Sequence, residues 1–64
     1  MKLTIEGMHC QKCVERVRKA IDGVEGARAD RVEVGSASVS VEPAREPLVI
    51  GAVRDAGYDA RETA

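Results

Sequence analysis

The sequence RVEVGSASVSVE, residues 31–42, gives the clearest structural signal in the chain. Apolar and polar residues alternate on both sides of Gly35-Ser36, and a period of two residues is typical of a half-buried β-strand. We expect Gly35-Ser36 to form a two-residue type II′ turn, because that turn favours glycine at its first position. The stretch is therefore predicted to be a β-hairpin.

The position of this turn decides which residues of the hairpin face each other. It pairs Val34 with Ala37 and Val32 with Val39, and it places all four on one face. The polar side chains then point to the other face; they are Glu33, Ser38 and Ser40. Pro43 is expected to end the second strand, because proline cannot donate a hydrogen bond to its neighbour.

Upstream of the hairpin, the pattern predicts one strand and one helix. MKLTIE, residues 1–6, alternates apolar with polar residues and stops at Gly7, as a strand would. From about Lys12, apolar residues recur at helical spacing with charged residues between them, which is typical of an amphipathic helix. We expect Gly23 to end this helix in the left-handed conformation, and residues 27–30 to be a connector to the hairpin.

Downstream of the hairpin, a second helix and a last strand are predicted. Pro47 suits a first helical turn, and Gly57 is expected to close the helix. The apolar residues at helical spacing between them are Leu48, Val49, Ala52, Val53 and Ala56. YDARET, residues 58–63, reads as a weak strand at a sheet edge.

The resulting order is βαββαβ. It predicts an α+β fold, a ferredoxin-like two-layer sandwich in which a four-stranded antiparallel sheet carries both helices on one face. A chain of 64 residues has room for one such domain, and we assign residues 1–64 to it.

Composition excludes several classes of protein. The chain has a formal net charge of −1, one tyrosine and neither phenylalanine nor tryptophan. Its core must therefore be built from small aliphatic residues, and its charge does not indicate nucleic-acid binding. There is no run of about 18 apolar residues and no signal-peptide pattern, so we expect a soluble cytoplasmic protein without membrane insertion.

Both cysteines and the single histidine lie in GMHCQKC, residues 7–13. Cys10 is expected in the loop after the first strand, and Cys13 in the first turn of the helix. Unpaired N–H groups at a helix start stabilise thiolates, and Lys12 adds a nearby cation. Such a pair suits metal capture or thiol–disulfide exchange, and its spacing alone does not decide between them.

Other features of the chain favour a metal. A thiol–disulfide oxidoreductase normally has a larger fold and an aromatic residue where this chain has His9. A closed zinc site takes four ligands from cysteine and histidine, and this chain offers three at most. Two thiolates match a soft ion of low coordination number, which is Cu(I) in the first place. Hg(II) is the next alternative, and Zn(II) follows.

GMHCQKC resembles the GMxCxxC signature of the heavy-metal-associated domain family, and DAGYDA, residues 55–60, resembles the AGY stretch of the same family. The βαββαβ order also matches, so the resemblance covers essentially the whole chain. It implies that Cys10 and Cys13 are the metal ligands. It also implies that Met8 packs inward beneath the loop and that Tyr58 lies beside the metal.

Three further residues could take part in the site in more than one way. His9 is either an exposed loop residue or a third ligand, within one chain or across a metal-bridged dimer. The Met8 thioether is expected to fill the core rather than to bind metal. Tyr58 is expected to cap the edge of the core and to shield the metal at the same time.

The first helix also carries four cations: Lys12, Arg16, Arg18 and Lys19. They form either a solvated face or a docking surface for an acidic partner, and for docking we single out Lys12, Arg16 and Lys19.

The family includes free-standing copper chaperones and N-terminal modules of copper-transporting P-type ATPases, and mercury-binding proteins share its fold. We expect a monomeric copper chaperone, not an enzyme, that passes Cu(I) to the metal-binding domain of such an ATPase by ligand exchange. Met1 and the absence of a linker favour the free-standing form. The alternatives are an ATPase module, a mercury-binding protein and, from another class, a thiol–disulfide oxidoreductase.

Overall fold

The strands and helices follow the predicted order in the computed structural model, which describes residues 1–63. Ala64, the last residue of the predicted domain, lies outside the described residues. The elements are β1 (Lys2–Glu6), α1 (Gln11–Asp22), β2 (Arg28–Glu33), β3 (Ser36–Ser40), a 3₁₀ turn η1 (Pro43–Arg45), α2 (Glu46–Asp55) and β4 (Asp59–Glu62).

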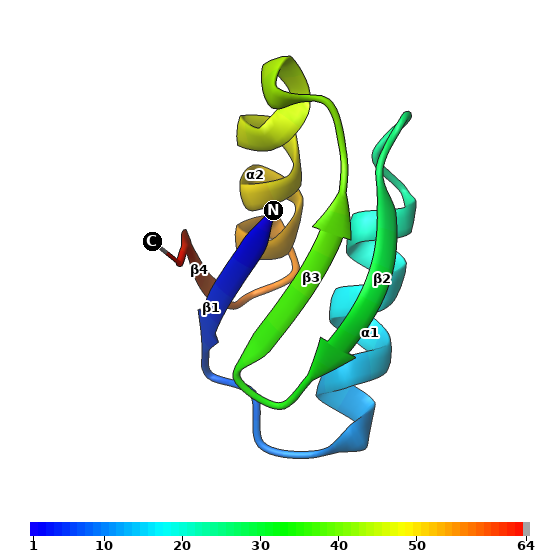
Figure 1. Cartoon of the computed structure of the whole chain (residues 1–64). Coiled ribbons are helices and arrows are strands. Elements are labelled where there is room, and N and C mark those ends of the chain that lie inside the picture. The colour runs from blue at the N-terminus through cyan, green and yellow to red at the C-terminus, as the bar shows by residue number, and fades with distance from the viewer. Residues whose placement is uncertain (64) are drawn as a thin grey trace.

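The four strands form one antiparallel sheet in the order β2-β3-β1-β4. Figure 1 shows that α1 and α2 lie on the same face of this sheet. The predicted ferredoxin-like sandwich is therefore confirmed, and β4 lies at a sheet edge as expected.

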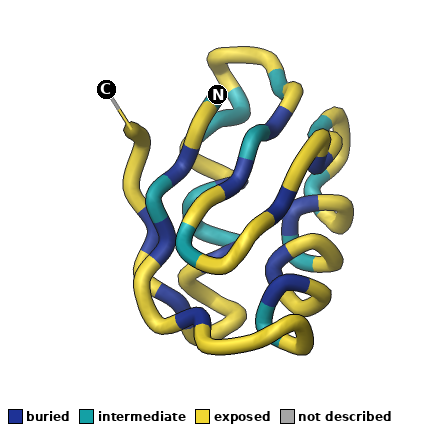
Figure 2. Tube along the Cα trace, turned by 60° about the horizontal axis from the view of Figure 1, so that its bottom comes forward, coloured by how far each residue is buried: buried dark blue, intermediate teal, exposed yellow. Residues whose placement is uncertain are grey.

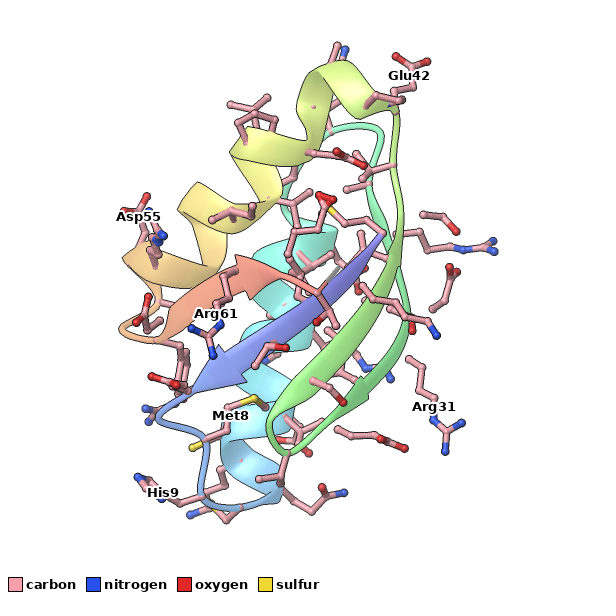
Figure 3. All side chains as sticks on the ribbon, turned by 60° about the vertical axis from the view of Figure 1, so that its left-hand side comes forward. Met8, His9, Arg31, Glu42, Asp55 and Arg61 are labelled. Carbon is pink, nitrogen blue, oxygen red and sulfur yellow. The ribbon has the colours of Figure 1, made fainter. Side chains whose placement is uncertain are left out.

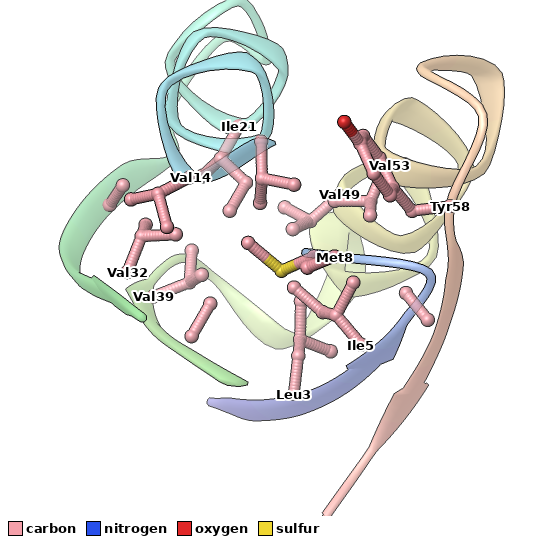
Figure 4. Packing of buried hydrophobic residues seen from close by; sticks show 14 residues of the cluster. Leu3, Ile5, Met8, Val14, Ile21, Val32, Val39, Val49, Val53 and Tyr58 are labelled. Carbon is pink, nitrogen blue, oxygen red and sulfur yellow. The ribbon is translucent and has the colours of Figure 1, made fainter. Parts of the chain in front are cut away.

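The core lies between the sheet and the two helices. Along β1 the buried Leu3 and Ile5 alternate with exposed residues, because successive strand side chains point to opposite faces. Along α1 the buried residues recur every three to four positions; they are Val14, Val17 and Ile21. Figure 2 shows these buried positions along one side of each helix, and Figure 4 shows the aliphatic side chains that meet in the middle.

The predicted register of the hairpin is wrong, because the turn lies one residue earlier in the chain than predicted. Val32 pairs with Ala37 and Glu33 pairs with Ser36, so the two loop residues are Val34 and Gly35. Gly35 has a φ of +92°, and Val34 has no positive φ. These signs match a type II turn, which needs glycine at its second central position rather than its first. Val34 therefore leaves the sheet and is 52% exposed.

Residues 27–30 are also not a simple connector, because β2 already begins at Arg28. The pairing of β2 with β3 shifts between Ala29 and Arg31, so Asp30 is an extra, bulged residue. Ala29 and Val32 both face the core although they are three residues apart. The bulge breaks the two-residue alternation by which a strand is recognised in sequence, so the predicted strand begins only at Arg31.

The ends of the helices differ from one another. Gly57 follows α2 with a φ of +101°, as expected for a residue that closes a helix. Gly23 instead keeps a right-handed φ of −74°, because the chain continues into a tighter turn in which the Val24 N–H donates to the Ile21 carbonyl. The left-handed residue of that loop is Gly26.

The buried face of α2 includes fewer residues than its apolar pattern predicts. Val49 and Val53 are fully buried, whereas Leu48 is 57% exposed, since it lies about 100° around the helix from Val49. Within residues 1–63, no helix combines the length and apolar character needed to cross a membrane.

Ile21 and Leu48 provide a matched test of this core. Ile21→Ala removes a fully buried side chain and should lower the free energy of unfolding by about 2–5 kcal/mol. Leu48→Ala should change it by no more than about 0.5 kcal/mol, because Leu48 is largely exposed. Urea denaturation followed by circular dichroism measures both; equal losses in the two variants would contradict this packing.

Candidate metal centre

The loop between β1 and α1 carries both cysteines. Gly7, with a φ of +97°, turns the chain out of β1, and Cys10 is extended and exposed just before the helix begins. The Cys10 carbonyl accepts hydrogen bonds from the N–H groups of Cys13 (3.0 Å) and Val14 (3.3 Å). Cys13 is half-buried and packs against the core. Backbone hydrogen bonds thus hold the two thiols together at one end of the molecule.

The environment of Cys13 favours its thiolate. Its pKa is lowered from 9.0 to about 7, first by a hydrogen bond from the Tyr58 hydroxyl and then by a backbone hydrogen bond from His9. Backbone and side-chain hydrogen bonds from Cys10 lower the pKa further, and partial burial of the thiol opposes the shift. A substantial fraction of Cys13 is therefore ionised at neutral pH, as a metal ligand must be.

Tyr58 is buried and lies next to this thiol. Its pKa is raised, first because its hydroxyl hydrogen-bonds to Cys13 and then because it is buried, while a hydrogen bond from Arg16 opposes the shift. A Cβ atom placed on Gly7 would lie 3.6 Å from the Tyr58 ring, so the ring also packs under the start of the loop. In Figure 4 the ring lies beside Val53 with its oxygen at the outer edge of the core.

Met8 lies in the core, where the sequence places it. Its side chain is 7% exposed, and its Sδ atom accepts a hydrogen bond from the Gly35 N–H at 3.4 Å. Figures 3 and 4 show it pointing inward between the sheet and the helices. The contact with Gly35 is not predictable from sequence, because no spacing pattern connects residues 27 positions apart.

His9 is exposed and projects away from the body of the protein (Figure 3). In residues 1–63 no group of three or more histidine, cysteine, aspartate or glutamate side chains is placed to hold one metal ion. The described arrangement is thus a pair of thiols, and the role of His9 stays a prediction.

The cations of α1 are all exposed; they are Lys12, Arg16, Arg18 and Lys19. The three ion pairs formed within the described part of the chain involve Arg28, Arg31 and Arg61, and none of the α1 cations. Their charge is therefore not neutralised by an ion pair within residues 1–63.

Comparisons with known proteins place this chain in a family. The model of the heavy-metal-associated domain matches residues 2–59. Copper chaperone CopZ of Bacillus subtilis is 34% identical over 61 residues, which cover 89% of this chain and 88% of that protein. A mercuric reductase from Shewanella putrefaciens is 38% identical over an alignment of 71 residues, gaps included. The alignment covers 95% of this chain but only 12% of the reductase.

Among solved structures, a copper binding domain from HMA7, a P-type ATPase, superposes with a TM-score of 0.91. It is 28% identical, and the match covers 100% of this chain and 92% of that domain. The likeness therefore includes the loop that carries the two cysteines.

The ionisation of Cys13 can be measured directly. In Cys10→Ser, which leaves a single thiol, the rate of alkylation by iodoacetamide should rise with pH around a midpoint of about 7 rather than 9.0, because only the thiolate reacts. Tyr58→Phe in the same background should move the midpoint upward, since it removes the largest stabilising hydrogen bond. A midpoint unchanged by Tyr58→Phe would contradict this account of the site.

Proposed function

Because the chain belongs to the heavy-metal-associated domain family, we propose that it binds one Cu(I) ion and passes it to a partner domain with its own pair of cysteines. The thiolates of Cys10 and Cys13 are the ligands. The observation that carries this proposal is the pairing of an exposed thiol with a half-buried one that ionises near neutral pH. In this function the protein makes and breaks no bond within a substrate, so it is not an enzyme.

The ligand set supports a soft ion. Two thiolates suit Cu(I), whereas a structural zinc ion would need four ligands, and within residues 1–63 no group of three or more histidine, cysteine, aspartate or glutamate side chains is placed to hold one ion. The similarity to a copper chaperone and to a copper binding domain supports the same ion. Hg(II) is the second candidate, because two thiolates bind it equally well and a mercuric reductase contains a similar segment.

Transfer by ligand exchange requires that a partner thiolate reach the ion before an original ligand leaves. The exposed position of Cys10 gives such access. As the ion leaves, Cys13 is left as a bare thiolate, and the Tyr58 hydroxyl is placed to stabilise it by hydrogen bonding. The donor thus releases its ion without first taking up a proton at Cys13.

The cations of α1, which form no ion pair within residues 1–63, support a partner with an acidic surface. Lys12 directly precedes Cys13, and Arg16 lies one turn further along the same helix. Complementary charge accelerates encounter and orients two surfaces for exchange. We propose that the partner is the metal-binding domain of a copper-transporting P-type ATPase, and that the protein works as a monomer in the reducing cytoplasm, where its thiols stay free.

Anaerobic titration against a competing chelator tests the ion and its ligands. Cu(I) should bind at one ion per chain and more tightly than Zn(II). Cys10→Ser and Cys13→Ser should each weaken Cu(I) binding by more than the roughly 10- to 100-fold typical of losing an outer-shell contact. His9→Ala should bind as the wild type does.

Other results of this titration would change the proposal. A stoichiometry of half an ion per chain, abolished by His9→Ala, would indicate a metal-bridged dimer with His9 as a ligand. Retention of Hg(II) with weak Cu(I) binding would favour mercury. A chain that binds neither ion but catalyses disulfide exchange would be an oxidoreductase.

Lys12→Glu tests the docking surface without touching Tyr58, which Arg16 contacts. It should slow Cu(I) transfer to the HMA7 metal-binding domain at low salt and leave Cu(I) affinity unchanged, because it alters encounter rather than ligation. The difference should shrink at high ionic strength. Lys2→Glu changes the charge equally on β1 and serves as the control; an equal effect of the two variants would refute docking through α1.

A further inference from the structure

The sheet has two free edges within residues 1–63, because β2 and β4 each pair with a single neighbour. Figure 1 shows these two strands on opposite sides of the sheet. Each edge strand lies against one helix, since α1 contacts β2 and α2 contacts β4. The unpaired N–H and C=O groups of an edge strand can bind a strand of another chain, so folded proteins need a way to prevent such pairing.

At the β4 edge, the main-chain groups of Ala60 point outward. Ala60 lies opposite Ile5 of β1, and the Ile5 N–H donates to the Gly35 carbonyl on the other side of β1 at 2.9 Å. Such a pair of antiparallel residues exchanges no hydrogen bonds, so the Ala60 N–H and C=O face away from β1. The Arg54 guanidinium, in the last turn of α2, donates to this outward carbonyl at 3.3 Å.

The β2 edge is covered in an equivalent way. Ala29 lies opposite Val39 of β3, and the Val39 N–H donates to the Met1 carbonyl on the other side of β3 at 2.8 Å. The Ala29 N–H and C=O therefore face away from β3. The Asp22 carboxylate, at the last residue of α1, accepts a hydrogen bond from this outward N–H at 3.2 Å. Each helix thus ends with a charged side chain that binds a main-chain group of the adjacent edge strand.

The position of Asp22 is not explained by the stability of α1. The C-terminal end of a helix carries a partial negative charge, which disfavours a carboxylate there. Asp22 and Arg54 are both exposed, and neither takes part in the three ion pairs found within residues 1–63. Their shared feature is the hydrogen bond to an edge strand, and its chemistry is matched: the anion binds an N–H and the cation binds a C=O.

Other features of the two edge strands also limit pairing. β2 is interrupted by the bulge at Asp30, and β4 has only four residues. Bulges, short edge strands and charged side chains are all means by which native proteins prevent edge pairing. The two hydrogen bonds therefore complete a pattern that is present at both edges.

We propose that Asp22 and Arg54 are blocking side chains that prevent the sheet from pairing edge to edge with a second copy of this chain. A strand of another copy can bind the outward groups of Ala29 or Ala60 fully only after it displaces the blocking side chain and breaks its hydrogen bond. This inference goes beyond the proposed function, because it concerns the edges of the sheet and not the metal loop.

The test follows aggregation of the metal-free chain, with its thiols kept reduced by a phosphine. Asp22→Ala and Arg54→Ala should each raise the aggregation rate, measured by light scattering, roughly two- to tenfold, the range that corresponds to one hydrogen bond. The two increases should multiply in the double variant, and its aggregate should show the infrared amide I band of intermolecular β-sheet. Asp22→Asn keeps an acceptor oxygen and should aggregate more slowly than Asp22→Ala.

Matched controls separate the edges from charge and from stability. Asp55→Ala removes the same charge as Asp22→Ala from the last residue of the other helix, and Arg61→Ala removes a cation from β4 itself. Neither side chain is hydrogen-bonded to a main-chain group within residues 1–63. Ile21→Val weakens the core mildly and keeps both blocking side chains. All three controls should aggregate close to the wild-type rate.

A double variant that aggregates no faster than Asp55→Ala and Arg61→Ala would overturn the inference. An increase that Ile21→Val reproduces would also overturn it, because aggregation would then follow stability rather than the edges. Failure of the wild type to bind Cu(I) would overturn the proposed function and leave this inference standing, since the aggregation test contains no metal.

Discussion

The Cys10 carbonyl accepts the first two hydrogen bonds of α1, from Cys13 and Val14, and both the start of this helix and the placement of the two thiols depend on them. The same turn of helix directs Val14 into the core and leaves Cys13 at the edge of the core. The packing of α1 on the sheet therefore also fixes where the two thiols lie. A small aliphatic core can hold a metal site in position because the site is built into the start of a packed helix.

Much of the fold was predictable from sequence, because its signals are local. Periods of two and of three to four residues located the strands and helices, and family membership is confirmed by the match over residues 2–59. The errors fall where local periodicity fails: at Asp30, where a bulge interrupts β2, and at Gly35, which could occupy either central position of the turn. Which strand residues face the core determines the register, and this depends on tertiary packing rather than on local sequence.

The candidate site was likewise predictable only in part. The cysteine spacing, the helix start and the inward position of Met8 followed from sequence or resemblance. The Gly35 contact to Met8 and the hydrogen bond that Arg16 directs to Tyr58 did not, since both connect segments that meet only in the folded chain. The first contact joins the metal loop to the β2–β3 turn, and the second joins α1 to the segment before β4. Cys10 in this loop is exposed, whereas the residues around the loop are held in place by these contacts.

The sole aromatic residue of the chain, Tyr58, is hydrogen-bonded to one of the two thiols. All near-ultraviolet absorbance and fluorescence from the aromatic side chains of this sequence therefore originates beside Cys13, with no background from its other residues. A change of state at Cys13 alters the hydrogen bond of the only chromophore that could record it. The unmodified chain thus carries a built-in optical probe for the state of Cys13.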